Sequence, residues 1–134
     1  MEALEGGDGT VLRWLGMAGF LINSRGTTVM VDPLLGGFDM PVMIEFPIDA
    51  AEVPRLDAVL VTHSDNDHYS VPTCRDLAGV TGAYHSTQYV ASLMRQEGLP
   101  GVRSRHRRAF CDRAGPGGGH AGGPCVAERL PGRQ

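Results

Sequence analysis

No lysine occurs in this chain of 134 residues, so all 12 of its basic residues are arginines. This usage is typical of GC-rich coding DNA. No apolar stretch approaches the roughly 20 residues that a membrane-spanning helix needs, which argues against a membrane partner. The chain opens with MEALEGGDGT, which lacks the basic and apolar regions of a secretory signal. We therefore expect a cytoplasmic protein.

Cysteine is also scarce: Cys74, Cys111 and Cys125 form no paired spacing. This excludes a disulfide framework and a Cys/His zinc finger, and it indicates free thiols in a reducing compartment. We expect Cys74 to be a buried small hydrophobe. The net charge of −3 gives no sign of a nucleic-acid partner. The expected partner is a small-molecule substrate, if the chain is active.

Charge and composition change near residue 102. Up to that point the chain has 5 arginines against 13 acidic residues, and beyond it 7 arginines against 2. The last part contains RSRHRR and GPGGGHAGG and hardly an apolar run. We expect an acidic N-terminal segment at 1–10, a folded unit at 11–102 and a basic Gly/Arg-rich tail at 103–134, which this composition predicts to be disordered.

Runs of apolar and β-branched residues bounded by glycine or proline predict several strands. Residues 34–55 follow Asp32-Pro33 and show no sustained period, so we expect a long loop there. Trp14 is expected in the core. The expected strands are 11–16, 20–23, 27–31, 57–62 and one within 80–85.

Two segments predict helices. Thr73 and Asp76 have the spacing of a capping box for a short helix through Leu77. Ser86 is the expected cap of a second helix that runs to about Glu97. The expected apolar face of that helix comprises Tyr89, Val90, Leu93 and Met94. Strands in succession followed by strand–helix alternation predict a layered α/β (α+β) domain.

The stretch VLVTHSDNDHYS places four candidate metal ligands directly after an apolar strand. Imidazole nitrogen and carboxylate oxygen suit zinc, iron or manganese. If alternate residues of the turn point to one side, His63, Asp65 and Asp67 converge, and His68 faces a second metal. The alternative is an exposed polar turn in which Asp65 and Asn66 make local backbone hydrogen bonds. An EF-hand is excluded, because its glycine and terminal glutamate are absent.

Three stretches in order, WLGMAGFLI, TTVMVDP and DAVLVTHSDNDHYS, resemble the amino-terminal half of the metallo-β-lactamase superfamily (MBL-fold metallo-hydrolases). The resemblance covers about residues 11–98. It is closest to the branch that includes L-ascorbate-6-phosphate lactonase and N-acyl-phosphatidylethanolamine phospholipase D. It implies one half of an αββα sandwich with the metals at one edge.

The resemblance also implies roles for residues of this chain. His63 and Asp65 would bind a first metal, Asp67 and His68 a second, and Asp32 would support the site. The implied cofactor is a divalent metal, zinc in the first place with manganese or iron as alternatives, two per intact site. The implied activity is metal-dependent hydrolysis, in which metal-bound hydroxide attacks a lactone or phosphoester. Asp67 would be catalytic and hold or accept the proton.

This chain departs from the family pattern in three ways. Asp65 stands where the family has a histidine, which favours harder metals. Met17 stands where the family often has another histidine. Nothing after Gly98 supplies the ligands that the family takes from its second half. The alternative function is therefore a truncated, catalytically inactive half-domain.

The tail raises a further hypothesis. Arg, Gly, Pro, Ala, Cys and His are the residues that GC-rich DNA yields out of frame. With suitable codons, residues 114–131 read one frame away give PVRVEVTPADHAWQNAY, an alternating strand followed by an Asp-His turn that resembles the next family motif. We infer a frameshift between about Gly98 and Arg103. A zinc cluster of His120 with the two tail cysteines, or RNA binding by RSRHRR, is the weaker interpretation.

Overall fold

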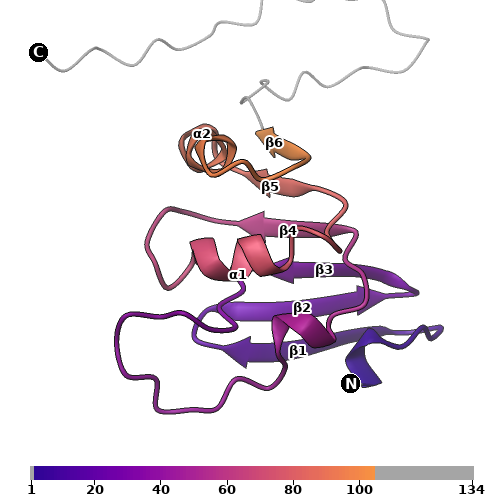
Figure 1. Ribbon diagram of the computed structural model, residues 1–134. Coiled ribbons are helices and arrows are strands. Elements are labelled where there is room, and N and C mark those ends of the chain that lie inside the picture. Colours follow the sequence, from indigo (N-terminus) through magenta and orange to yellow (C-terminus); the bar gives the residue numbers. More distant parts are fainter. Residues whose placement is uncertain (1, 105–134) are drawn as a thin grey trace, which may run out of the picture.

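The computed structural model describes residues 2–104, whose strands form one six-stranded sheet (Figure 1). The strands are β1 (Thr10–Gly16), β2 (Gly19–Ser24), β3 (Thr27–Val31), β4 (Ala58–Val61), β5 (Tyr84–Ser86) and β6 (Val102–Ser104). The helices are α1 (Val71–Asp76), α2 (Gln88–Gln96) and the short 3-10 helices η1 (Glu2–Leu4) and η2 (Ala50–Glu52). The expected strands all form, and the α/β fold class is confirmed.

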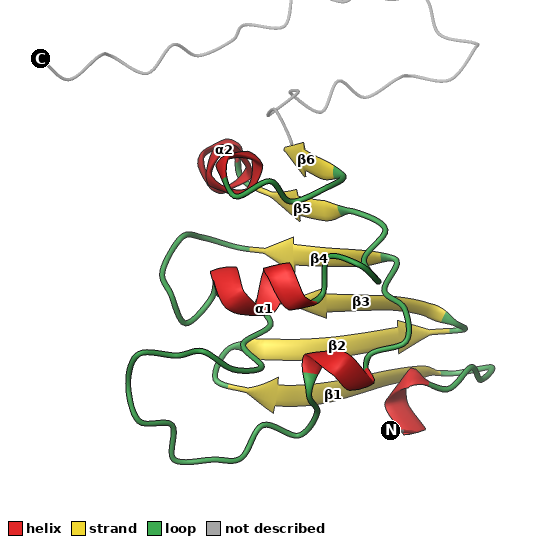
Figure 2. Cartoon of the chain, viewed as in Figure 1, coloured by secondary structure: helices red, strands yellow, loops and turns green. Residues whose placement is uncertain are grey.

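The strands lie side by side in chain order. β1, β2 and β3 form an antiparallel meander, whereas β3 to β6 run parallel (Figure 2). Parallel neighbours need crossover connections, and their carboxyl ends meet at the same edge of the sheet. The residues that follow β3 and β4 are therefore brought together, although about 30 residues separate them in the chain.

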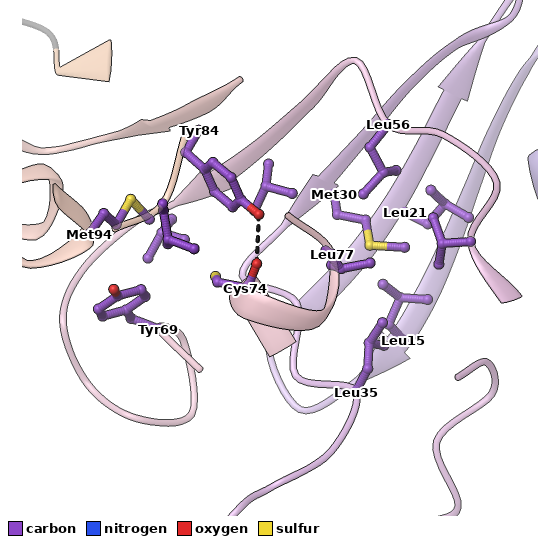
Figure 3. Packing of buried hydrophobic residues seen from close by; sticks show 14 of the residues in the cluster. Leu15, Leu21, Met30, Leu35, Leu56, Tyr69, Cys74, Leu77, Tyr84 and Met94 are labelled. Carbon is purple, nitrogen blue, oxygen red and sulfur yellow. Dashed lines mark hydrogen bonds between the residues drawn. The ribbon is translucent and has the colours of Figure 1, made fainter. Parts of the chain in front are cut away.

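The core lies between one face of the sheet and the helices. Alternate strand residues point into it, and α1 and α2 contribute their apolar sides (Figure 3). Core residues with no more than 1% exposure include Leu21, Met30, Val59, Cys74, Leu77, Tyr84, Val90 and Met94. Burial raises the pKa of the Cys74 thiol to about 12, so it stays protonated and unreactive. The expectation of a buried Cys74 is confirmed.

The opposite face of the sheet is open and apolar. Trp14, Phe20, Val31 and Leu60 are successive cross-strand neighbours on it. Trp14 is 54% exposed, so its expected place in the core is wrong. The physical reason is strand alternation: Leu15 points into the core, and its neighbour Trp14 must point the other way.

Both helices begin at other residues than expected. Ser70 caps α1, because its hydroxyl accepts a 3.2 Å hydrogen bond from the Thr73 N–H. Thr73 therefore lies inside the helix, and the capping box with Asp76 is wrong. Thr87 caps α2 and Ser86 belongs to β5. Tyr89 is 64% exposed, so the buried side of α2 comprises Val90, Ala91 and Met94 instead.

The two ends of the folded unit also differ from expectation. Asn23 of β2 donates to the carbonyls of Ala3 and Glu5, which ties the N-terminal segment to the sheet. Arg103 and Ser104, expected to open the tail, pair with β5. The rest of the expected tail, with His120 and two cysteines, lies outside the described residues. No helix within residues 2–104 is long and apolar enough to cross a membrane.

Candidate metal centre

The candidate ligands follow the adjacent ends of β3 and β4. β3 ends at Val31, and Asp32 follows with a φ of 44°, in the left-handed region that aspartate tolerates better than most residues. β4 ends at Val61, and the chain then makes a tight turn. The N–H groups of His68 and Tyr69 both donate to the carbonyl of Asp65, at 2.9 and 2.7 Å. This turn folds the motif back toward β3.

Asp32 joins the two strand ends. Its Oδ1 accepts a 2.7 Å hydrogen bond from the N–H of Thr62, and its Oδ2 accepts one of 2.6 Å from the Thr62 hydroxyl. The same Oδ2 lies 2.9 Å from Nδ1 of His68. Asp32 is only 3% exposed. A buried carboxylate thus holds both the end of β4 and a histidine of the motif, as the resemblance implied.

The four predicted ligands form two pairs. Nε2 of His63 lies 3.3 Å from Oδ2 of Asp65, and Nε2 of His68 lies 3.5 Å from Oδ2 of Asp67. The two imidazole centroids are 3.9 Å apart. These are the pairs that the resemblance assigned to a first and a second metal. Their role as ligands stays a prediction.

The expected convergence of three side chains is not what the geometry shows. Within residues 2–104, no group of three or more His, Cys, Asp or Glu side chains is arranged to hold one ion. The rule of alternate residues assumed an extended chain. The turn that closes on the Asp65 carbonyl is tightly curved, so Asp67 lies with His68 rather than with His63.

The donor set fits a metal ion. An ionised carboxylate only accepts hydrogen bonds, so His68 must carry a proton on the Nδ1 that faces Asp32. Its Nε2 then has a lone pair, and it faces the carboxylate of Asp67. An imidazole nitrogen and a carboxylate oxygen 3.5 Å apart can hold a cation between them, either a second proton or a metal. Two ligands about 2.1 Å from a tetrahedral ion lie about 3.4 Å apart, which matches both pairs.

The exposed-turn alternative accounts for part of this geometry. The Asp65 carbonyl accepts local backbone hydrogen bonds, and the side chains of His63 and Asp65 are 46% and 74% exposed. That alternative does not account for the Asp65 carboxylate, which faces His63, or for the Asn66 amide, which donates a 3.0 Å hydrogen bond to Oδ1 of Asp39. Asp39 lies in the long loop after β3, so this bond fastens the loop to the motif. Sequence reasoning missed Asp39, because nothing local marks it.

A further histidine of the folded unit, His85, lies in β5 on the open face, where its cross-strand neighbours are Leu60 and Arg103. Met17 occupies the position where the family often has histidine. It has a φ of 48°, and its carbonyl accepts a hydrogen bond from the Trp14 indole. Sequence reasoning also missed Thr62, although its place at the end of an apolar strand beside the first histidine was a usable signal.

Comparison with known proteins agrees with this fold and motif. The family model for the β-lactamase superfamily domain matches residues 11–119. A UPF0173 protein of Pyrococcus furiosus is 30% identical over 92 residues, which cover 67% of this chain and 37% of that protein. A UPF0173 metal-dependent hydrolase of Hyperthermus butylicus is 40% identical over 57 residues, which cover 42% of this chain and 23% of that protein.

Among solved structures, CmlA, a diiron β-hydroxylase from Streptomyces venezuelae, superposes with a TM-score of 0.58 at 25% identity. The match covers 72% of this chain and 20% of that one. The chain belongs to the metallo-β-lactamase superfamily. It spans well under half the length of these relatives, and its open sheet with helices on one face is a partial form of the superfamily fold.

Proposed function

We propose that these residues form one side of a two-metal centre in a hydrolase that acts on a lactone or a phosphoester. The observation that carries the proposal is the pair of histidine–carboxylate contacts at 3.3 and 3.5 Å, each between an Nε2 and a carboxylate oxygen. The hydrolase class is supported by the relative that is named a metal-dependent hydrolase. The substrate class is supported by the resemblance of the motif to the lactonase-like branch.

His63 with Asp65 would hold one ion, and His68 with Asp67 the other. Such ions supply Lewis-acid chemistry and lower the pKa of water. Asp32 is buried and engaged by Thr62 and His68, so its task is to orient the site. Asp67 is the carboxylate that we assign to hold or accept a proton, because its side chain is 38% exposed, whereas that of Asp32 is only 5% exposed.

We take zinc as the first candidate metal and iron or manganese as competitors. Asp65 in place of a histidine gives the site two carboxylates and two imidazoles, a set that harder ions also accept. The similarity to a diiron protein gives the iron alternative its support. The free and buried thiol of Cys74 fits the reducing, cytoplasmic setting that we propose.

The metal can be tested on the full chain. Protein incubated separately with Zn²⁺, Mn²⁺ and Fe²⁺ and then desalted is expected to retain about two ions per chain of the preferred metal. His63→Gln and His68→Gln should each lower the retained metal, whereas the control His85→Gln should not. The metal proposal fails if the native protein retains no more metal per chain than a double His63→Gln/His68→Gln variant does.

The activity is a separate measurement. Metal-loaded protein is assayed against a panel of lactones and phosphoesters, with and without a chelator. Hydrolysis that the chelator abolishes, and that Asp67→Asn reduces, supports the proposed class. Hydrolysis that survives complete removal of metal contradicts it.

A second candidate is a non-catalytic half-domain that binds metal weakly or not at all. It is favoured by the open apolar face of the sheet and by the lack of a three-ligand group within residues 2–104. It predicts little retained metal, poor solubility and no hydrolysis. Metal content therefore separates the two candidates before any substrate is known.

A further inference from the structure

A continuous chain of hydrogen bonds runs from the buried Asp32 through Thr62 to the first histidine. The Thr62 hydroxyl lies 2.6 Å from Oδ2 of Asp32 and 2.9 Å from Nδ1 of His63. We propose that Thr62 is a positioning residue that fixes the tautomer of His63, leaving its Nε2 unprotonated and aimed at the metal. The role of this hydrogen-bond chain in metal binding rests on the proposed metal centre, whereas the tautomer of His63 does not depend on it.

The proton count gives the direction of each bond. A threonine hydroxyl has one proton, and the carboxylate of Asp32 accepts it because it has none to give. The Thr62 oxygen then has only lone pairs to offer His63. Nδ1 of His63 must therefore carry a proton and donate it to Thr62. In a neutral imidazole this leaves Nε2 as the acceptor, and Nε2 is the atom 3.3 Å from the Asp65 carboxylate.

The same carboxylate reaches the second histidine without an intermediary. Oδ2 of Asp32 faces Nδ1 of His68 at 2.9 Å. Both histidines thus present Nε2, one through a direct bond to Asp32 and the other through Thr62. A metal-binding histidine commonly has its second nitrogen fixed in this way by a carboxylate, carbonyl or water. Here the buried Asp32 fixes the second nitrogen of both histidines, directly for His68 and through the Thr62 hydroxyl for His63.

The position of Thr62 argues for this task rather than for packing. Its side chain lies at the exposed end of β4, outside the core, so the hydroxyl does not serve to fill the interior. Its backbone N–H also donates to Asp32, at 2.7 Å, which holds the residue in place whichever side chain it carries. Removing only the hydroxyl should therefore release His63 while the strand end stays bonded to Asp32.

The test compares Thr62→Val, which keeps the shape and removes the hydroxyl, with Thr62→Ser, which keeps the hydroxyl. Thr81→Val is the matched control, because that hydroxyl bonds to the carbonyl of Leu77 at the end of α1, away from the motif. The ¹⁵N shifts of the histidine rings are recorded on chelator-treated full-length protein at about pH 8.5, where ordinary imidazoles are neutral. Zinc affinity is then measured by competition with a chelator.

We expect His63 to be protonated on Nδ1 in the native protein, in Thr62→Ser and in Thr81→Val. In Thr62→Val the ring should show a mixture of tautomers, and zinc affinity should fall about 10- to 100-fold. An unchanged Nδ1–H tautomer in Thr62→Val overturns the inference. If the tautomers behave as expected but no variant binds metal, the proposed metal centre fails and the positioning role of Thr62 is upheld.

Discussion

The hydroxyl of Tyr84 donates a 2.6 Å hydrogen bond to the main-chain carbonyl of Cys74, and both residues are fully buried (Figure 3). Cys74 lies near the end of α1, where carbonyls have no partner within the helix. The Tyr84 side chain, from β5, thus supplies a hydrogen-bond donor across the core to a carbonyl near the end of α1. Burial, the main cause, raises the pKa of Tyr84 to about 12 from an ordinary 10.

The first prediction concerns alkaline stability. The raised pKa means that Tyr84 stabilises the fold fully below about pH 10 and loses this contribution as the pH rises through 12. Tyr84→Phe leaves the Cys74 carbonyl without its hydrogen-bond donor, so the free energy of unfolding should fall by about 1–2 kcal/mol at neutral pH. Because the variant has no phenol to ionise at this position, its stability should also fall less between pH 10 and 12 than that of the native protein.

Urea unfolding at a series of pH values measures both effects. Tyr89→Phe is the control, because that ring is 64% exposed. Burial also raises the pKa of Tyr69 to about 12, but that contribution is common to both variants. Equal stability of the two variants across the series would count against the role assigned to Tyr84.

Asp57 gives a prediction in acid. Its carboxylate accepts a 2.8 Å hydrogen bond from the N–H of Thr28 and pairs with Arg55 at 2.8 Å. The Thr28 N–H, followed by Arg55, lowers the pKa of this carboxyl below its ordinary 3.8. A lowered pKa stabilises the fold above pH 3.8, and this stabilisation disappears as the pH falls through the folded-state value.

Asp57→Asn should therefore be less stable than the native protein at pH 7, and the difference should shrink as the pH falls below 3.8. Thermal unfolding from pH 7 down to pH 2.5 checks this. Asp8→Asn, in the exposed N-terminal segment, is the control and should follow the native curve. A gap between Asp57→Asn and native protein that persists unchanged in acid would contradict the assignment.

The sequence was most informative where structure is local. The apolar and β-branched runs in residues 11–31, with two glycine turns between them, predicted β1, β2 and β3 closely, because each turn and strand is set by neighbouring residues. The face that each strand buries was harder to predict. Both faces of this sheet are apolar, so residue type did not separate Trp14, which is exposed, from Leu15, which is buried.

The site was predictable as a set of residues and not as an arrangement. The motif and the resemblance pointed to His63, His68 and Asp32. Which of them touch depends on the parallel register of β3 and β4, in which Val31 pairs with Leu60. That register is a property of the folded sheet. It is what brings Thr62 within bonding distance of Asp32.

The open face of the sheet predicts poor solubility. Phe20 and Leu60 are both 37% exposed and flank Val31 in one cross-strand row. A contiguous apolar patch of this kind favours association. Replacing both with threonine, which suits strands, should raise solubility and lower the binding of a hydrophobic dye such as ANS.

Met43→Thr is the matched control for that variant. Its side chain is 94% exposed but lies in the loop before β4 and not on a strand of the sheet. It removes a more exposed apolar group, so an effect of exposure alone would appear in it most strongly. If the control improves solubility as much as the double variant does, the sheet face is not the cause.

The last prediction concerns the coding DNA after β6. Leu99 is buried, and Val102 packs against the core, so the chain fits the fold up to this strand. β6 continues to Ser104, so a frameshift in this part of the gene would fall beyond the interval from Gly98 to Arg103, after Ser104. The codons beyond it should read ADHAWQN in the shifted frame, and sequencing the gene tests this directly. Codons that cannot yield those residues eliminate the frameshift, and the basic segment must then be explained as a selected sequence.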